Sequence, residues 1–505
     1  MDKFSTALGG LTPQRLQGIR RGIEKESLRT DPEAALAATP HPAALGSALT
    51  LPRITTDFSE AQLELITGVH ASVDDCLREL TQIQQFTVRA MGDELLWVSS
   101  MPCGLPDDAA IPVGQYGSSN TGRLKSMYRV GLGHRYGRRM QTISGIHYNW
   151  SVSETSSADY FGLIRNFRRN AFLLLYLFGA SPAVCGSFVA GREHRLQPLA
   201  EGTLYLPHAT SLRMGRLGYQ SDAQAALAVS YNDLAGYANA LEQALTQPYA
   251  PYAAVGVKAP DGQYRQLSTS LLQIENEFYG TIRPKRVLQG DERPLHALRA
   301  RGVEYVEVRL LDLNPFEVVG ISAQTMRFLD VFLLHCLASP SAPDSPEEVA
   351  AVARNQHRVA ERGREPGLTL ERGAQRVSLV DWGLELVPQW RAIAQALDAA
   401  QGGTAHAAAV DAAEHGLRQS DDLPSAQVLR EMVDLHAGSF VKFVKACSAR
   451  TRQTMLAQPL APAVAAHFQQ LAQRSLAEQT QIEQSDTLTL DDYLTQYLSA
   501  QRLQP

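Results

Sequence analysis

The 505-residue sequence contains little of what marks several large classes of protein. Its five cysteines are widely spaced and form no Cys-x-x-Cys pair, so zinc ribbons and redox dithiols are not indicated and free thiols are expected. The cysteines are Cys76, Cys103, Cys185, Cys336 and Cys447. The longest apolar run, residues 171–178, is far too short to span a membrane. No apolar signal-peptide core follows Met1, and we therefore expect a cytoplasmic protein.

The sequence also lacks the charge distribution and the glycine motifs of common nucleic-acid- and nucleotide-binding proteins. Its 47 basic residues are scattered and outnumbered by 52 acidic ones, which argues against nucleic acid as a partner. No Gly-x-x-x-x-Gly-Lys-Ser/Thr motif occurs, and the glycines of residues 131–137 do not fit Gly-x-Gly-x-x-Gly. Neither a P-loop nor a dinucleotide fingerprint is therefore present. If a nucleotide binds, metal ions and residues on strands must hold it.

What the sequence does contain is acidic residues at alternate positions, in sets that end near an arginine. Glu24 and Glu26 form the plainest set, and on an extended strand they point to the same face because side chains alternate. Two like charges so close together repel each other unless a cation lies between them, so the pair indicates bound metal. In residues 302–310 the same alternation places Glu307 and Arg309 on one face of a strand whose other face is apolar.

Two more acidic sets and one histidine add to this pattern. A third set lies in residues 55–64, which contain Asp57, Glu60 and Glu64, a fourth is Glu275 and Glu277 in residues 273–277, and His147 stands in the alternating stretch 141–149. A single acidic pair is more often an exposed strand face or a surface salt bridge. Four sets with a histidine favour a site for a hard cation, because carboxylate oxygens with at most one imidazole suit Mg²⁺ or Mn²⁺ and suit zinc poorly.

The composition of the chain changes near residues 338–348. Before that point, short alternating segments between turns and helical stretches predict an antiparallel or mixed sheet with packed helices. After it, the sequence predicts helices at residues 346–362, 379–400, 424–447, 462–483 and 489–501. No flexible linker intervenes, so we expect residues 1–337 as a catalytic core and residues 338–505 as a mainly helical part packed on it. The small-residue loop at 114–123 is either a long turn or a mobile cover over a site.

Taken together, these stretches closely resemble the proteobacterial type of glutamate–cysteine ligase, also called γ-glutamylcysteine synthetase. The similarity covers most of the chain up to about residue 375 and is carried by residues 18–29, 54–60, 141–149, 210–213, 282–286 and 304–309. The resemblance implies an α+β protein with a glutamine-synthetase-like catalytic fold, in which helices surround a curved, mainly antiparallel sheet. It also implies the conversion of ATP, L-glutamate and L-cysteine to γ-glutamylcysteine, ADP and phosphate through γ-glutamyl phosphate, the first step of glutathione biosynthesis.

The resemblance further implies roles for particular residues of this sequence. Metal ions, Mg²⁺ or alternatively Mn²⁺, are expected at Glu24, Glu26, Asp57, Glu64, His147 and Glu307. Arg309 beside Glu307 is expected to stabilise the transferring phosphoryl group, which makes these two the catalytic pair. The expected glutamate contacts are Arg129, Gln141 and Asn149, and the expected cysteine contacts are Phe58, Arg213, Tyr219 and Tyr279. Lys285 and Arg286 are candidates for the ATP phosphates, or a basic surface pair.

Two other functions stay open at this point. The first is a related ligase of the same fold that uses another amine, such as ammonia or a polyamine, although Arg213 favours an acceptor with a carboxylate. The second is a non-catalytic regulator that binds nucleotide or metal. Arg309 beside six metal-ligand candidates argues against it, because a protein that only binds does not need a cation that stabilises a transition state. Glutathione is a further expected partner, as a feedback inhibitor, and no contact with a membrane is expected.

Overall fold

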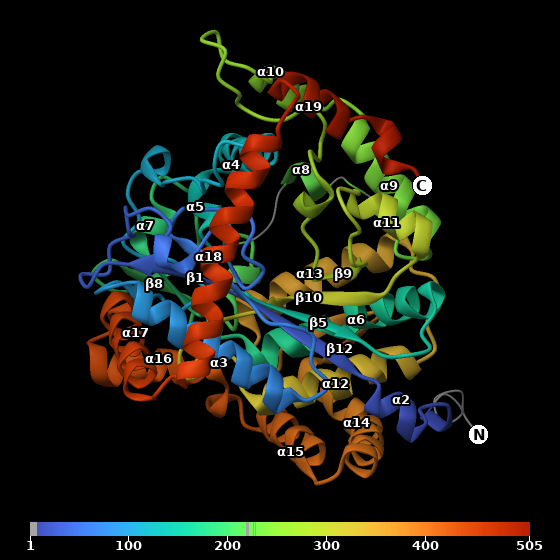
Figure 1. Ribbon diagram of the computed structural model, residues 1–505. Helices are drawn as coiled ribbons and strands as arrows, with labels where there is room; N and C mark the ends of the chain where they lie inside the picture. The colour runs from blue at the N-terminus through green and yellow to red at the C-terminus, as the bar shows by residue number, and fades with distance from the viewer. Residues whose placement is uncertain (1–7, 219–221, 226, 228) are drawn as a thin grey trace.

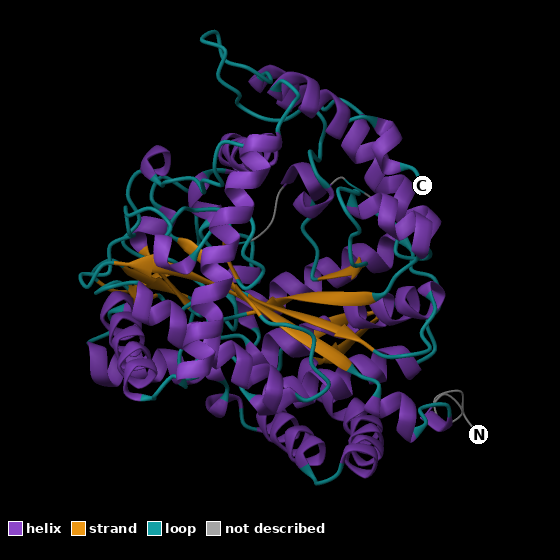
Figure 2. Cartoon of the chain, in the orientation of Figure 1, coloured by secondary structure: helices purple, strands orange, loops and turns teal. Residues whose placement is uncertain are grey.

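The computed structural model describes residues 8–218, 222–225, 227 and 229–505, and a seven-stranded sheet lies at its centre (Figures 1 and 2). The strand order is β2 (Ile54–Thr56), β3 (Gln62–Ile66), β1 (Arg20–Thr30), β5 (Ile146–Ser151), β10 (Tyr305–Leu311) and β9 (Ile282–Lys285), and β4 (Leu95–Leu96) pairs with the end of β1. All of these pairs are antiparallel. The α+β class that the sequence predicts is therefore confirmed.

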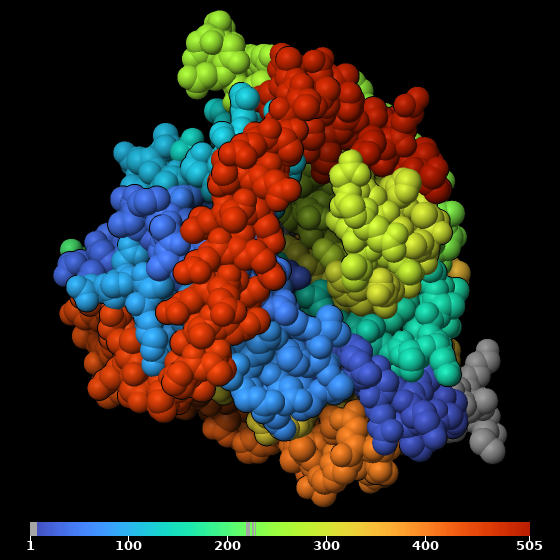
Figure 3. Space-filling view, in the orientation of Figure 1, coloured from blue at the N-terminus to red at the C-terminus, as the bar shows by residue number. Residues whose placement is uncertain are grey.

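The two faces of this sheet differ because side chains alternate along each strand. On β10, Val306 and Val308 are fully buried. Helices α3 (Val73–Ala90), α6 (Ser157–Phe178) and α12 (Ala323–Ala338) pack on that apolar side. The opposite face carries the acidic residues. In the orientation of Figure 1, the space-filling view shows a hollow in the surface (Figure 3). The alternation read from the sequence thus separates a core face from a polar face.

One carboxylate of α12 ties two strands together from beneath the sheet. Asp330 is fully buried, and its Oδ1 accepts hydrogen bonds from the Tyr148 hydroxyl at 2.9 Å and from Trp150 Nε1 at 3.1 Å. Its Oδ2 lies 2.9 Å from Nη2 of Arg21. Tyr148 and Trp150 belong to β5 and Arg21 to β1, so this network fixes two neighbouring strands to α12. A buried ion pair with its remaining acceptors satisfied, as here, is costly to break.

Further helices and two small sheets surround the central sheet. The remaining helices before residue 338 are α2 (Pro13–Gln17), α4 (Asn120–Tyr136), α5 (Arg138–Gln141), α7 (Gly186–Val189), α8 (Asp222–Ala225), α9 (Leu234–Thr246), α10 (Ala250–Val255) and α11 (Pro294–Arg301). The small sheets are β6 (Ala183–Cys185) with β8 (Thr203–Tyr205) and β7 (Gln197–Ala200), and β11 (Thr369–Arg372) with β12 (Gln375–Ser378). Within the described ranges, no helix has the length and apolar character needed to cross a membrane.

The C-terminal part is helical, as the sequence predicts. Its helices are α13 (Pro346–Arg362), α14 (Leu379–Gln401), α15 (Ala405–Arg418), α16 (Pro424–His436), α17 (Phe440–Ala457), α18 (Pro462–Ser485) and α19 (Leu490–Tyr497). The single helix expected at 424–447 is wrong. Ala437 and Gly438 adopt positive φ angles of 52° and 75° and end α16, and the Ser439 side chain then caps α17 by accepting from the Lys442 backbone.

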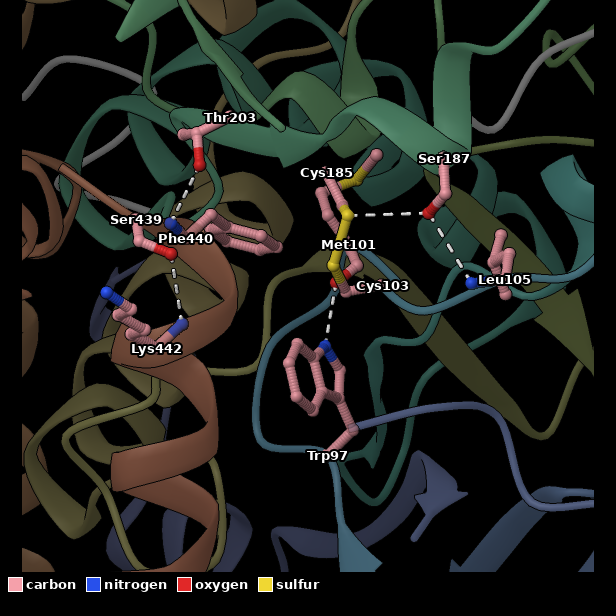
Figure 4. The surroundings of a disulfide bond; sticks show 10 residues. All are labelled: Trp97, Met101, Cys103, Leu105, Cys185, Ser187, Thr203, Ser439, Phe440 and Lys442. Carbon is pink, nitrogen blue, oxygen red and sulfur yellow. Dashed lines mark hydrogen bonds between the residues drawn. A yellow bond between two sulfur atoms is a disulfide. The ribbon is translucent and has the colours of Figure 1, made fainter. Parts of the chain in front are cut away.

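The expectation of free thiols is wrong for two of the five cysteines. Cys103 and Cys185 form a disulfide that links residues 82 positions apart, with their Cα atoms separated by 5.2 Å (Figure 4). The Ser187 hydroxyl lies 3.4 Å from the Cys185 sulfur and accepts a hydrogen bond from the Leu105 backbone. Cysteine spacing could not reveal the pair, because β6 and the segment of Cys103 meet only in the folded chain. The other three cysteines are free and buried.

Lys25 lies on the core face of β1, between the acidic positions that face the other way. Its side chain is 1% exposed and donates a hydrogen bond to Gln84. Burial lowers the pKa of this ammonium from the ordinary 10.5 to about 7. Between these two values the unfolded chain holds a proton that the folded chain has lost, so this group favours folding increasingly as the pH rises.

We therefore predict that Lys25→Met gains stability relative to wild type at low pH, and that this gain shrinks as the pH rises from about 7 to 10.5. The lost hydrogen bond to Gln84 costs the same at every pH. Only the change with pH of the stability difference between the variant and wild type therefore reports the titration of Lys25. Melting temperatures across the pH range measure it, with the exposed Lys442→Met as the matched control. Parallel profiles for wild type and Lys25→Met would contradict the prediction.

Candidate active site

The register of the sheet brings the predicted carboxylates together on its polar face. Glu24 on β1 lies opposite His147 on β5, and Glu26 lies opposite Glu64 on β3. On the far side of β5, strand β10 adds Glu307. Residues that are distant in sequence meet here because each strand presents its acidic position to the same side.

His147 lies at the centre of this cluster and is 3% exposed. Its Nδ1 is 3.1 Å from Glu24 Oε2 and 3.8 Å from Glu307 Oε1. Its Nε2 is 3.4 Å from Glu26 Oε1. A second oxygen of Glu24 accepts a hydrogen bond from Asn149 at 2.8 Å. One imidazole therefore touches three carboxylates, a donor set that suits an oxygen-preferring cation.

The best-defined group of possible metal ligands is Glu24, Glu64 and His147, whose ligand atoms all lie within 4.8 Å of one another. Burial raises the pKa of Glu64 well above its ordinary range, and the negative charges of Glu24, Asp57 and Glu26 raise it further. In the absence of a cation, the ionised form of Glu64 is therefore disfavoured. A bound divalent ion would lower the pKa of Glu64, which is the behaviour expected of a ligand in an acidic metal site.

Glu307 has the opposite electrostatic environment. Burial alone would raise its pKa, but the cations of Lys285, Arg309 and Arg283 hold it well below the ordinary value. Arg309 Nη1 donates to Glu307 Oε1 at 3.0 Å, Lys285 Nζ is 3.7 Å from the same oxygen, and Arg283 Nη1 is 3.7 Å from Oε2. Among the described residues, no hydrogen bond reaches Glu307 Oε2 or Asn149 Oδ1. Both buried oxygens are suitable acceptors for a cation.

Helix α4 borders the cluster at the opposite edge, near β2 and β3. Arg129 donates from Nε to the backbone carbonyl of Asp57, and its guanidinium lies 4.4 Å from the ring centre of Tyr116. Lys125, one turn earlier, places its Nζ 5.4 Å from the same ring. Burial lowers the pKa of Lys125 to about 8, and the neighbouring Arg129 charge lowers it further, whereas Glu64 opposes this change. The polar face therefore has cations at both edges.

The other predicted binding residues lie nearby in several different settings. Arg213 is 2% exposed, donates to the Arg309 carbonyl at 2.9 Å, and lies against Gly145, where a Cβ would find no room. Within the described part of the chain its Nε has no hydrogen-bond partner. Gln141 donates to the Tyr279 hydroxyl at 2.7 Å. Tyr219 lies outside the described residues.

Two predicted residues have mainly packing or backbone contacts. Phe58 is 2% exposed and belongs to an apolar cluster with Leu124 of α4 and Leu490 of α19. Arg286 donates to the backbone carbonyl of Arg301, at the end of α11, and its Nε lies 3.5 Å from Glu304 Oε2. None of these contacts identifies a ligand, so the roles of Phe58 and Arg286 stay predictions.

The acidic set at residues 273–277 is not part of this site. Glu275 and Glu277 lie in a 3₁₀ turn (Glu275–Glu277) outside the sheet. Glu275 pairs with Arg293 at 2.7 Å, and Glu277 pairs with Arg135. Both acids are buried and satisfied by arginine, so the expectation that they share the alternating strand pattern is wrong. Their spacing reflects two structural ion pairs.

The loop at residues 114–123, for which the sequence left two interpretations open, packs against the C-terminal helices. The Ser118 backbone donates to Glu483 of α18 at 2.8 Å, and the Asn120 side chain donates to the Leu488 carbonyl at 3.0 Å. From there α19 continues to the opposite rim (Figure 1), where Arg293 donates to the Tyr497 carbonyl at 3.2 Å. Residues 486–505, here called the C-terminal strap, thus join the α4 side of the hollow to the α11 side.

Sequence reasoning did not single out Lys125, Tyr116 or Arg283. The four-residue spacing of Lys125 and Arg129 in a helix was the available signal, because such residues share one face. Arg283 alternates with Lys285 on β9 and could have been found by the same rule that found Glu24 and Glu26. No local signal indicates that Tyr116 packs beneath α4.

The family model and the most similar curated proteins all indicate the same family. The family model described as glutamate–cysteine ligase matches residues 11–359. A glutamate–cysteine ligase of Saccharophagus degradans is 47% identical over 502 residues, covering 95% of this chain and 94% of that protein. One of Pseudomonas aeruginosa is 48% identical over 494 residues, covering 94% and 93%.

Solved structures give the same result. The crystal structure of a glutamate–cysteine ligase from Francisella tularensis in complex with AMP matches with a TM-score of 0.91 and 37% identity, over 96% of this chain and 98% of that one. A bifunctional glutathione synthetase from Pasteurella multocida matches with a TM-score of 0.72 and 25% identity, over 94% of this chain and 58% of that one.

Proposed function

The chain belongs to the glutamate–cysteine ligase family, and we propose that the carboxylates on its sheet hold the magnesium ions that its use of ATP requires. The enzyme joins the γ-carboxylate of L-glutamate to the amino group of L-cysteine and forms ADP and phosphate, the first step of glutathione biosynthesis. The observation that supports the residue roles best is the buried set of carboxylates around His147, bordered by cations at both edges.

The reaction needs ATP because an amine does not displace oxide from an ionised carboxylate. The γ-carboxylate oxygen of glutamate attacks the γ-phosphorus of ATP, ADP leaves, and γ-glutamyl phosphate results. The amine of cysteine then attacks the acyl carbon and phosphate leaves, with release of a proton from nitrogen. Both steps move negative charge between oxygens, so fixed cations beside the reacting groups accelerate them.

We propose six metal ligands, which are Glu24, Glu26, Asp57, Glu64, His147 and Glu307. The raised pKa of Glu64 and the Glu307 oxygen that accepts no hydrogen bond from the described residues both fit a cation at this place. Mg²⁺ is the proposed ion, and Mn²⁺ is the alternative that the same ligands accept. When bound, such an ion neutralises charge on the phosphate oxygens during transfer.

The phosphoryl group is proposed to lie at the β9–β10 edge of the sheet. Arg309 and Lys285 both contact Glu307 there. Arg309 can present a forked, permanently charged group to the transferring phosphoryl, whereas Lys285 offers a compact charge to the ATP phosphates. Arg286 is proposed as a further phosphate contact, since its side chain remains 25% exposed although its Nε lies 3.5 Å from Glu304 Oε2.

The two amino-acid substrates are proposed to bind around the carboxylate cluster. Arg129, Gln141 and Asn149 form the proposed glutamate subsite. Phe58, Arg213, Tyr219 and Tyr279 form the proposed cysteine subsite. The unsatisfied Nε of buried Arg213 supports its role as the contact for the cysteine carboxylate.

We also propose that residues 338–505 and the core at 1–337 form one unit with a glutamine-synthetase-like, curved sheet. Contacts of α14 and α15 with α12 beneath the sheet, and of α19 with α4 at the rim, support this. Few contacts cross the boundary between independent domains, so contacts at two separate places favour one unit. A cytoplasmic location and feedback inhibition by glutathione stay predictions from the sequence.

The acceptor is tested by a panel of amines. With ATP, Mg²⁺ and glutamate, the protein should release ADP when L-cysteine is added, and also with L-2-aminobutyrate, in which a methyl group replaces the thiol. The thiol takes no part in the chemistry, so the analogue should work. Turnover with ammonia or putrescine but not with cysteine would show that the acceptor is a different amine.

The cysteine subsite is tested by Arg213→Ala. This variant should raise the KM for cysteine and leave the KM for ATP nearly unchanged, because it removes a contact to one substrate's carboxylate. The matched control is Arg364→Ala, which removes an arginine bound to the backbone carbonyl of Pro207 and should change neither constant. A larger effect of Arg213→Ala on ATP than on cysteine would place Arg213 at the nucleotide.

The metal role is tested by Glu307→Gln, which keeps the shape and removes one charge. We expect a higher demand for Mg²⁺ and a kcat lower by about 10²-fold or more, with the fold retained. Activity across a Mg²⁺ titration and the melting temperature measure the two effects, and the exposed Glu33→Gln is the control. A destabilised variant with a wild-type Mg²⁺ response would make Glu307 a structural partner of Arg309 instead.

A further inference from the structure

Two cations on α4 face the carboxylate cluster without a carboxylate of their own. Lys125 and Arg129 are one helical turn apart, and both lie over the ring of Tyr116. The hydrogen bonds of Arg129 go to backbone carbonyls, those of Asp57 and Lys125. Within the parts of the chain that the structure describes, neither side chain forms an ion pair with an acidic residue. Two adjacent, partly buried like charges are unfavourable unless an anion joins them.

The pair is held rigidly, which is what a binding clamp requires. Tyr116 is 2% exposed, and its hydroxyl donates to the backbone carbonyl of Asp57 at 2.8 Å. Arg129 donates to the same carbonyl. The ring below the cations and Arg129 are therefore both fastened to the turn at Asp57. Because Asp57 is also a proposed metal ligand, the clamp has a fixed position relative to the metal cluster.

The ligand follows from the charges of the substrates. Arg309 and Lys285 lie beside Glu307 at the β9–β10 edge, where the ATP phosphates are proposed to bind. Arg213 contacts the Arg309 backbone and is proposed to hold the cysteine carboxylate. Lys125 and Arg129 lie at the opposite edge, near Glu64 on β3. Of the substrate anions, the α-carboxylate of glutamate is the one left for Arg129 of the proposed glutamate subsite, and Lys125 lies one helical turn from Arg129.

We propose that Lys125 acts with Arg129 to bind the α-carboxylate of glutamate, and that Lys125 thereby selects glutamate over acids that lack this group. The inference rests on the proposed function and adds a residue to its glutamate subsite. Arg129 supplies a forked donor and Lys125 a compact one, so the two fit one carboxylate from different directions. With the α-carboxylate held at α4, the γ-carboxylate extends towards Glu64 and the proposed metal ions.

The first test compares Lys125→Met, which keeps the length of the side chain and removes its charge, with Lys125→Arg and with the exposed control Lys442→Met. We expect Lys125→Met to raise the KM for glutamate about tenfold or more and to leave the KM values for ATP and cysteine unchanged. Lys125→Arg should restore most of the affinity, and the control should match wild type. An unchanged KM for glutamate in Lys125→Met would overturn the proposal.

The second test removes the partner group from the ligand. 4-Aminobutyrate is glutamate without its α-carboxylate, and its inhibition constant against glutamate can be measured in each variant. We expect Lys125→Met to weaken the binding of glutamate and to leave the inhibition constant of 4-aminobutyrate unchanged. The preference for glutamate over 4-aminobutyrate should then fall by the same factor as the affinity for glutamate. Equal weakening of the binding of glutamate and of 4-aminobutyrate would assign Lys125 to the carboxylate that the two compounds share, or to the metal site, and would overturn the proposal. Wild-type protein without ADP release from glutamate and cysteine would contradict the proposed function itself.

Discussion

The uneven balance of buried charge across one sheet is the constraint on which the site depends. At the β9–β10 edge, three cations hold the pKa of Glu307 well below its ordinary value. At the β1–β3 side, burial and neighbouring acids raise the pKa of Glu64 far above it. The protein therefore supplies cations for one part of the cluster and leaves the other part short of positive charge. That shortage is the physical reason to place the proposed metal ions beside Glu24, Glu64 and His147.

A rigid core beneath the sheet makes this concentration of charge possible. Asp330 joins α12 to β1 through Arg21 and to β5 through Tyr148 and Trp150. These contacts lie on the opposite side of the same two strands that place Glu24 against His147. Repulsion between acids favours separation of the strands, and the buried network opposes it. The stability of the apolar side is thus coupled to the geometry of the polar side.

The rim of the site is completed by segments from the end of the chain. The C-terminal strap (residues 486–505) follows α18, contacts the loop before α4 through Asn120, and reaches α11 through Arg293. The proposed clamp of Lys125 and Arg129 stands on the helix that the strap covers. The helical C-terminal part therefore contributes to the position of the substrate-binding wall, although it carries none of the proposed ligands of metal, nucleotide or amino acids.

The sequence by itself determined the features that depend on local periodicity. Alternation placed Glu24 with Glu26 and Glu307 with Arg309 on polar strand faces, and the helix expected at residues 346–362 has the bounds of α13, which the Ser345 side chain caps. The family resemblance supplied the reaction, which the comparisons confirm. Only the tertiary structure decided contacts between distant segments: the Cys103–Cys185 bond, the removal of residues 273–277 from the sheet, and the contact of α4 with the turn at Asp57 between β2 and β3. The physical reason is that periodicity sets which face a side chain occupies, whereas strand register and packing set which faces meet.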